Sequence, residues 1–304
     1  MAKYLILIFC LILTGCNNSG DEKNSSVNSV SKKFCGYNLS DPDEKMIMPT
    51  VLHEISGISV IDSVSVACIQ DEHGIVFFYD VHKKVITNQI SFNGKGDFEG
   101  ITVADDTIFA LRSDGVLYEI KNFTSSNLVR KLTLKNLPYN NNEGLCYDQK
   151  NRRLLIAPKD KLKKNFEVKV KHGIYAYDLS RRKFIDQPVI SLSLSAIKKF
   201  ASDNKILDQT ISAKKDSNSR PEIKFRPSDI SIHPLTGKLF LLSGSEQMLF
   251  VFNSNGDIEN MIQLDPRIYN MPEGITFFKN GDMLISNEGQ KGHPTLLRLN
   301  YNPE

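Results

Sequence analysis

One short motif occurs five times in this chain, as Glu54-Ile-Ser-Gly-Ile58, Asp97-Phe-Glu-Gly-Ile101, Asn141-Asn-Glu-Gly-Leu145, Arg226-Pro-Ser-Asp-Ile230 and Met271-Pro-Glu-Gly-Ile275. The middle residues of the copies are Ser56, Glu99, Glu143, Ser228 and Glu273, which fall 43, 44, 85 and 45 residues apart. A period of this length is typical of a four-stranded propeller blade, and it is longer than most helical repeats. The spacing therefore predicts a repeat protein.

The same order of strands and turns follows every copy. A second apolar strand ends in a polar cluster, as in Met283-Leu-Ile-Ser-Asn-Glu-Gly289, and a third strand is rich in aromatic and branched residues, as in Leu249-Phe-Val-Phe252. Such residues suit a pleated, half-buried surface. We therefore expect an all-β fold, a five-bladed β-propeller with four-stranded antiparallel blades.

The gap between Glu143 and Ser228 spans about two periods, so six blades are the alternative. The interval holds a charged hairpin tip at residues 161–171 and a stretch at 193–204 whose apolar residues recur at helical spacing. A polar loop at 213–220 follows. A short helical insertion at about 193–220 accounts for the extra length, and we predict five blades.

The N-terminus has the pattern of a bacterial lipoprotein signal. Lys3 precedes an apolar run at residues 4–13, too short to span a bilayer, and the run ends in Leu13-Thr-Gly-Cys16. We expect a signal peptide at 1–15, lipidation of Cys16, a flexible stalk at 16–33 and a propeller domain at 34–304. The alternative is an ordinary secretory signal in which Cys16 is incidental. The pattern predicts a membrane-anchored, extracytoplasmic protein of the bacterial cell envelope.

Composition limits the partners. The net charge of +3 and the pI near 8.4 come from Lys and Arg residues scattered among acids, so neither nucleic acid nor an anionic membrane surface is indicated. Cys35, Cys68 and Cys146 show no metal-binding spacing. Cys68 and Cys146 lie in strand patterns and are expected to be buried, whereas a disulfide through Cys35 remains open.

The last blade has three clear strands, which begin near Pro272, Met283 and Thr295. An uncovered strand edge invites aggregation. Residues 34–39 precede the first motif, so we predict that they supply the missing fourth strand and join the two ends of the ring.

The motif copies, with Asp71-Glu-His-Gly74 and Arg226-Pro-Ser-Asp-Ile-Ser-Ile-His-Pro234, resemble the SdiA-regulated family of bacterial envelope propellers. The resemblance covers nearly the whole folded part. It implies a five-bladed propeller distantly similar to NHL-repeat proteins, with a bound calcium ion and no established activity.

The residues themselves point to a cation site. First strands of blades line the central channel, so Glu99, Glu143 and Glu273 should form a ring at one mouth, where close carboxylates repel unless a cation intervenes. Calcium accepts six to eight oxygen ligands in irregular geometry. The predicted metal ligands are Glu99, Glu143, Glu273, Asn287 and Asp71. The predicted channel-lining residues are Ser56, Ser228, Asp229, Lys159, Asp114 and Glu288.

A purely structural interpretation stands beside this one. Lys159 could neutralise part of the ring by pairing with Glu143, and the glutamates could accept hydrogen bonds from backbone amides of the neighbouring blade. The motif glycines are better explained by close backbone packing. Asp229 replaces that glycine in the fourth copy, and either Ser228 or Asp229 could contribute to the mouth there.

Two functions fit these features. The first is a binding or scaffold module for an unknown small molecule, glycan or protein, because fold alone does not define activity. The alternative is a calcium-dependent hydrolase of the lactonase or esterase type, with the metal as Lewis acid, Glu143 or Glu273 as general base and Lys159 as anion clamp. The signatures of serine hydrolases, zinc proteases and phosphate-binding loops are missing from the sequence. His53 and His73 are the histidine pair worth testing.

Overall fold

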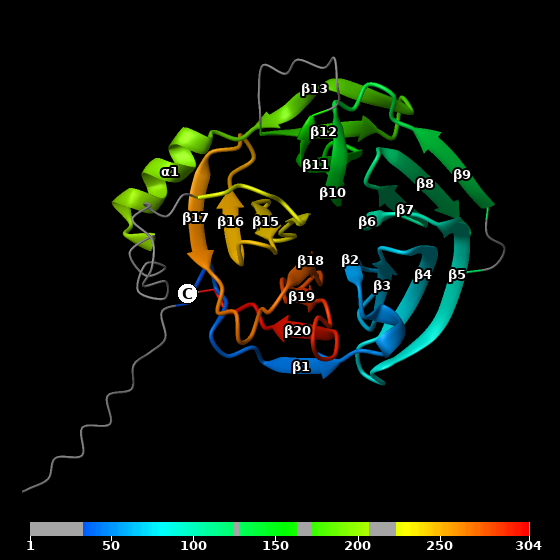
Figure 1. The fold of residues 1–304 in the computed structure, drawn as a ribbon, viewed down its shortest axis with the longest axis horizontal. Helices are drawn as coiled ribbons and strands as arrows, with labels where there is room; N and C mark the ends of the chain where they lie inside the picture. Colours follow the sequence, from blue (N-terminus) through cyan, green and yellow to red (C-terminus); the bar gives the residue numbers. More distant parts are fainter. Residues whose placement is uncertain (1–32, 125–127, 163–171, 207–222, 304) are drawn as a thin grey trace, which may run out of the picture. The chain divides into compact units, whose positions relative to one another are not determined.

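The computed structural model describes residues 33–124, 128–162, 172–206 and 223–303. The predicted signal peptide, Cys16, most of the charged hairpin tip and the polar loop at 213–220 lie outside these residues. The described residues form five four-stranded antiparallel sheets placed around a central axis (Figure 1). The prediction of five blades is confirmed, and the six-bladed alternative is wrong.

Each blade runs from an inner strand to an outer strand in chain order, apart from the last. Blade 1 contains β2 (Ile55–Val60), β3 (Ser65–Gln70), β4 (His73–Asp80) and β5 (Val85–Lys95). Blade 2 contains β6 (Phe98–Ala104), β7 (Thr107–Arg112), β8 (Val116–Lys121) and β9 (Leu128–Thr133). Blade 3 contains β10 (Tyr139–Asp148), β11 (Arg153–Leu162), β12 (Gly173–Asp178) and β13 (Lys183–Ser191). Blade 4 contains β14 (Asp229–Ile232), β15 (Leu239–Ser243), β16 (Met248–Phe252) and β17 (Ile258–Gln263). Blade 5 contains β18 (Pro272–Phe277), β19 (Met283–Asn287), β20 (Thr295–Leu299) and β1 (Glu44–Ile47).

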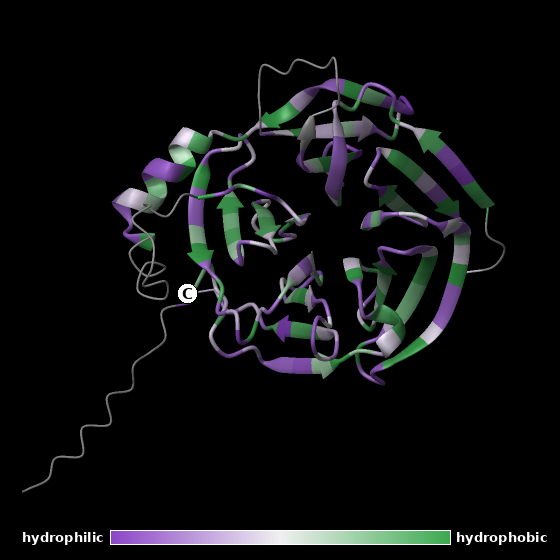
Figure 2. Cartoon of the chain, in the orientation of Figure 1, coloured by the Kyte–Doolittle hydropathy of each residue, from purple (hydrophilic) through white to green (hydrophobic). Residues whose placement is uncertain are grey.

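Hydropathy follows position within a blade. Every residue of β15 and β16 is buried, whereas five of the six residues of the outer strand β9 are exposed. Figure 2 shows β16 as almost wholly hydrophobic and β9 as a mixture. The core lies between blades: one cluster joins Ile69 of blade 1 to Ile101 of blade 2, for example. Middle strands are buried on both faces because each blade packs against two neighbours.

The ring closes through an N-terminal strand, as predicted, but at different residues. β1 (Glu44–Ile47) pairs with β20 in antiparallel register, with Met46 opposite Leu296. Residues 34–39 instead form a compact turn, because Cys35 and Gly36 both have positive φ and Phe34 bridges to Tyr37. The apolar side chains of this turn pack into the core that joins blades 4 and 5. The predicted location of the strand was therefore wrong.

The helix expected in the insertion is present as α1 (Leu194–Asp203), and the Ser193 side chain caps it by accepting a hydrogen bond from Ala196 N. Ile197 and Ala201 are buried in the core shared by blades 3 and 4, and α1 lies beside the outer strand β17 at the perimeter (Figure 1). The helix therefore packs on the rim and does not cover the channel.

Cys35, Cys68 and Cys146 are free thiols. Cys68 and Cys146 are buried, as expected, and within the described residues Cys35 forms no disulfide.

Candidate functional site

The inner strands β2, β6, β10, β14 and β18 pack against one another around the axis, so backbone comes close to backbone there. A Cβ added to Gly57 would lie 3.1 Å from the carbonyl oxygen of Glu99, and one added to Gly144 would lie 3.0 Å from Ile230 N. These distances are tighter than ordinary contacts. The motif glycines therefore allow each blade to approach the next, which is the structural role expected from the sequence.

Asp229, which replaces the glycine in blade 4, joins three blades. Its carboxylate accepts hydrogen bonds from Ile230 N at 2.8 Å, from Ile275 N of blade 5 at 2.8 Å and from Leu145 N of blade 3 at 3.4 Å. Burial raises the pKa of Asp229 well above its ordinary value, although the three N–H donors act in the opposite direction. The side chain is 2% exposed and lies between blades.

Ser56 and Ser228 take the glutamate position of the motif in blades 1 and 4, and both are buried. The hydroxyl of Ser56 donates to the carbonyl oxygen of Phe98 at 2.7 Å, and the hydroxyl of Ser228 lies 3.3 Å from the carbonyl oxygen of Pro272. Phe98 and Pro272 occupy the same position in the motif of the next blade. These serines therefore link consecutive blades near the mouth.

The three motif glutamates form one electrostatic cluster with Lys159. Lys159 Nζ lies 2.8 Å from Glu143 Oε2, so the ion pair considered in the structural interpretation is present. Burial alone would lower the pKa of Lys159, but the carboxylates of Glu143 and Glu273 outweigh this effect and raise it. Lys159 also acts on Glu99 and Glu273 and opposes the rise of their pKa values.

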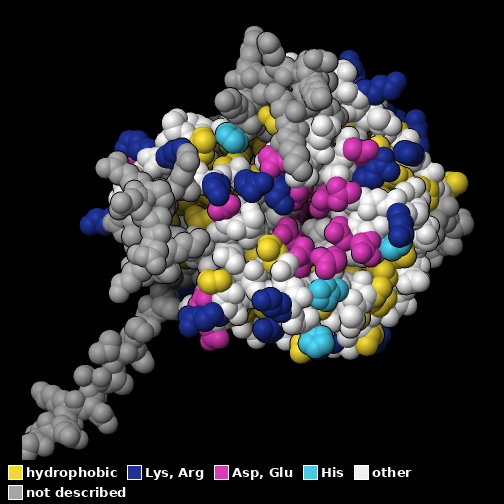
Figure 3. All heavy atoms as spheres, in the orientation of Figure 1, with side chains coloured by type: hydrophobic (Ala, Val, Ile, Leu, Met, Phe, Trp, Pro, Cys, Tyr) yellow, Lys and Arg dark blue, Asp and Glu magenta, His cyan; other side chains and the backbone are white. Residues whose placement is uncertain are grey.

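One lysine does not compensate three carboxylates. Burial, followed by the charge of Glu143, raises the pKa of Glu99 to about 9. Burial also raises the pKa of Glu273 to about 8, against the effects of Lys159 and a hydrogen bond with Ser228. Figure 3 shows acidic side chains gathered at the centre of the ring on this face. If all three glutamates were ionised, the positive charge of Lys159 would therefore not be enough to neutralise them in the described structure.

A second acidic group adjoins the first. Burial and then the charge of Glu54 raise the pKa of Asp71. Burial also raises the pKa of Glu288, which interacts electrostatically with Glu54, Asp71 and Lys159, and which acts on Glu273. Glu288 therefore connects the two groups, and the acidic surface extends from the inner strands to the ends of the second strands.

The remaining predicted residues have separate surroundings. Asp114 forms an ion pair with Arg112 at 2.8 Å, and half of its side chain is exposed. Asn287 is fully buried and donates to Thr295 Oγ1 at 3.1 Å. His53 Nδ1 contacts Glu54 at 2.8 Å, whereas His73 Nδ1 contacts Gln70 at 3.3 Å, so each histidine has its own partner.

The buried oxygen atoms that lack hydrogen-bond partners in the described structure include the amide or carboxylate oxygens Asp71 Oδ1, Asn142 Oδ1 and Asn287 Oδ1. Buried polar atoms are nearly always paired. Two of these residues were predicted as ligands, and Asn142, which precedes Glu143, was not. Carboxylate and amide oxygens suit calcium. In the described conformation, however, no three carboxylate, imidazole or thiol side chains converge at coordination distance.

A ring of side chains at the far end of the inner strands was not predicted. It lies three residues after the motif centre in each blade and consists of Ser59, Thr102, Cys146, Ser231 and Thr276. Thr276 Oγ1 accepts from Val60 N, Ser59 Oγ from Val103 N, and Thr102 Oγ1 from Tyr147 N. The Cys146 thiol is bonded to Ile232 N in the same way. The recurrence of Ser or Thr three residues after the motif centre in four of the five copies is the sequence signal that could have predicted this ring.

This hydroxyl ring borders a cavity of about 710 Å³. The wall of the cavity includes the ends of all five inner strands, so the cavity lies at the channel mouth opposite the glutamates. The described part of the chain thus has two distinct channel mouths, one acidic and one where hydroxyl and apolar groups are mixed with charges of both signs, among them Asp62 and Lys279.

The fold and the acidic mouth define a class, a five-bladed propeller with a charged axial site. A family model described as SdiA-regulated matches residues 43–290, and the chain belongs to this family. Comparison with curated protein sequences returns no significant match.

Solved structures with a similar fold include the glutaminyl cyclase of Myxococcus xanthus. That similarity has a TM-score of 0.58 at 10% identity and covers 86% of this chain and 96% of the other. Weaker similarities are found to a nidogen/laminin complex (TM-score 0.42, 13% identity, 77% and 72% covered) and to the Pan2 WD40 domain of Neurospora crassa (0.40, 8%, 82% and 64%). At 10% identity, the similarity to the glutaminyl cyclase shows the fold alone.

Proposed function

We propose that this protein is a lipid-anchored binding module of the bacterial envelope whose acidic channel mouth holds a calcium ion. The observation that carries the proposal is the cluster of Glu99, Glu143 and Glu273 around the single amine of Lys159, which cannot compensate three ionised carboxylates. A hard divalent cation would stabilise these carboxylates in their charged form.

The donor chemistry fits such an ion. Glu99, Glu143 and Glu273 offer carboxylate oxygens, and Asn287, Asn142 and Asp71 offer buried oxygens that lack hydrogen-bond partners in the described structure. Because Lys159 bonds Glu143 in the described conformation, a bound cation would compete with Lys159 for that carboxylate. The ion would fix the inner strands relative to one another, and the mouth would then present a rigid surface to a small molecule, glycan or protein.

The membrane attachment rests on the sequence pattern that ends in Cys16. No helix among the described residues is long and apolar enough to cross a bilayer. Each acyl-chain methylene that is buried in the bilayer stabilises membrane attachment by about 0.8 kcal/mol. The acyl chains on a lipidated Cys16 would therefore hold the propeller at the membrane. Labelling of cells with a palmitate analogue should mark the wild-type protein, and labelling of a Cys16→Ser variant to the same extent would contradict the anchor.

The calcium site is tested by thermal unfolding of the fragment from Lys33 onward, in chelator and then with calcium, magnesium or zinc. An ion that binds only the folded state, present at a concentration of about 100 times its Kd, increases the free energy of unfolding by about 2.7 kcal/mol. We expect calcium to raise the midpoint by several degrees and the Glu143→Gln, Glu273→Gln double variant to lose this rise.

Two variants serve as controls. Glu119→Gln removes a buried glutamate that pairs with Arg182 away from the channel, so its calcium response should equal that of the wild type. Lys159→Gln removes the competing amine and should increase the apparent calcium affinity. An unchanged midpoint with every cation, in the wild type and in Lys159→Gln, would refute the metal site.

A further inference from the structure

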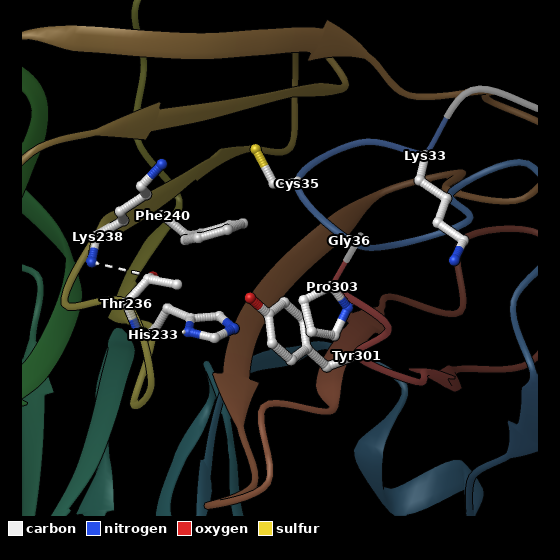
Figure 4. A pocket seen from close by; sticks show the side chains of 9 residues that line it. All are labelled: Lys33, Cys35, Gly36, His233, Thr236, Lys238, Phe240, Tyr301 and Pro303. Carbon is white, nitrogen blue, oxygen red and sulfur yellow. Dashed lines mark hydrogen bonds between the residues drawn. The ribbon is translucent and has the colours of Figure 1, made fainter.

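A second pocket lies away from the channel, where the first and last described residues meet blade 4. It has a volume of about 250 Å³, and its wall includes Lys33, His233, Lys238, Phe240, Tyr301 and Pro303. Figure 4 shows the ring of His233 and the hydroxyl of Tyr301 turned toward each other, with Lys238 and Cys35 on the other side of Phe240.

The state of His233 follows from its hydrogen bonds. His233 Nδ1 accepts from Leu235 N and from Thr236 N, both at 3.2 Å. An imidazole nitrogen that accepts two N–H groups carries no proton, so the proton of the neutral ring lies on Nε2. Burial, followed by the positive charge of Lys238, lowers the pKa of His233 to about 4, which keeps the ring neutral at pH 7.

His233 Nε2 is therefore a hydrogen-bond donor, and it lacks a partner in the described structure although the residue is only 1% exposed. Leaving such a group unpaired costs about 1–3 kcal/mol. A metal ion is excluded as the partner in this tautomer, because one ring nitrogen is engaged with backbone N–H groups and the other carries a proton. The missing partner is a hydrogen-bond acceptor.

The charges and the aromatic surface around His233 indicate which chemical class of hydrogen-bond acceptor fits the pocket. Lys238 interacts electrostatically with His233, Cys35 and Tyr301, while Glu259 pairs with Lys238 at 2.8 Å. Lys33 adds a second ammonium group at the rim. Phe240 and Tyr301 supply aromatic surface next to the donor, with ring centroids 5.8 and 4.6 Å from that of His233. An anionic head with a short apolar tail matches this combination.

We propose that this pocket, formed by His233, Lys238, Phe240, Tyr301, Lys33 and Pro303, binds a small organic carboxylate. One carboxylate oxygen accepts from His233 Nε2–H and from the Tyr301 hydroxyl, and the two lysines provide positive potential at the rim. The tail lies against Phe240 and Pro303. Because Lys33 and Tyr301 flank the described core of the chain, the ligand would also fasten the N- and C-terminal segments to blade 4.

The full-length chain, labelled with ¹⁵N and observed by side-chain imidazole NMR, provides the test. We expect sodium butyrate to shift the His233 Nε2 signal saturably in the millimolar range. Butyramide, which has the same shape without the charge, and sodium chloride at equal ionic strength should leave the signal in place. Chelator should not alter the response, because the pocket is separate from the acidic mouth.

Variants separate binding from folding. Tyr301→Phe removes one donor and leaves the backbone cap of His233 intact, so butyrate affinity should fall while the folded spectrum is retained. Lys238→Gln should weaken binding by roughly 2- to 5-fold, whereas Lys45→Gln on the exposed side of β1 should have no effect. Equal responses to butyrate and butyramide, or no saturable shift in the wild type, would overturn the proposal and assign the Nε2–H to the face of the Tyr301 ring.

Discussion

Lys159 and the three motif glutamates show how single residues set the chemistry of the channel mouth. The amine of Lys159 bonds Glu143 directly, yet the pKa values of Glu99 and Glu273 remain raised to about 9 and 8 because burial dominates. The sequence offered this pairing as the structural alternative, since Lys159 stands where other blades have acidic or polar residues. The role of Asp229 was not predictable, because its three backbone donors belong to three different strands.

The raised pKa values have a consequence for stability in the absence of metal. Between the ordinary glutamate value of 4.5 and values of 8 to 9, folded Glu99 and Glu273 retain protons that the unfolded chain has released. Stability contributed by this difference is present at low pH and is lost as the pH rises through the folded pKa. Each group can contribute a slope of up to about 1.4 kcal/mol per pH unit.

We therefore expect the free energy of unfolding in chelator to decrease from about pH 6.5 to 9, and the contribution of these two glutamates to be complete above this range. The window begins above the unfolded pKa of His233, whose lowered folded value gives the opposite slope at lower pH. Urea unfolding at several pH values measures the effect. The Glu99→Gln, Glu273→Gln double variant should remove most of the slope, and a wild-type stability that rises across this window would show that both glutamates are ionised when folded.

Strands acquire their positions through side chains that the motif does not contain. The hydroxyl ring of Ser59, Thr102, Cys146, Ser231 and Thr276 lies three residues beyond each motif centre and accepts backbone N–H groups of the next blade in the contacts described above. Alternation along a strand could be read from the sequence. The direction of these hydroxyls, across the gap between blades, could not, because it depends on how neighbouring inner strands twist past each other.

The ring of hydroxyls can be tested at one position in blade 2. Thr102→Val keeps the shape of the side chain but removes the acceptor for Tyr147 N, which lies 3.1 Å away. A fully buried N–H group left unpaired costs about 1–3 kcal/mol, and because this hydrogen bond is only partly buried we expect a loss near the lower end of that range in chemical denaturation. Thr102→Ser retains the acceptor and should lose less. Equal losses in the two variants would attribute the effect to packing and not to the hydrogen bond.

At the scale of the whole molecule, the propeller is closed by an N-terminal strand in its last blade. The sequence predicted this kind of closure correctly but not the residues that form the strand. The sequence predicts that the N-terminal segment supplies the missing fourth strand of blade 5, which is confirmed, but it places that strand at the apolar residues near Phe34. They fill the core between blades 4 and 5 instead, and Tyr37 donates to the carbonyl oxygen of Gly281 at 2.6 Å. The actual strand, Glu44–Ile47, has four residues and a single buried side chain, so it is too short to show an alternating strand pattern in the sequence.

This closure makes a prediction about cooperativity. Met46 of β1 is 1% exposed and packs in the core with Leu284 and Leu296, whereas the adjacent Ile47 is 63% exposed. Met46→Ala should therefore cost about 2–5 kcal/mol, and Ile47→Ala should change stability by no more than about 0.5 kcal/mol. If β1 completes the ring, the loss at Met46 must appear as a lower midpoint of one transition for the entire propeller, observed alike by far-ultraviolet circular dichroism and by hydrogen exchange in blade 2. A separate early transition confined to β1 would instead mean that the four-stranded last blade forms without being required for the rest of the ring.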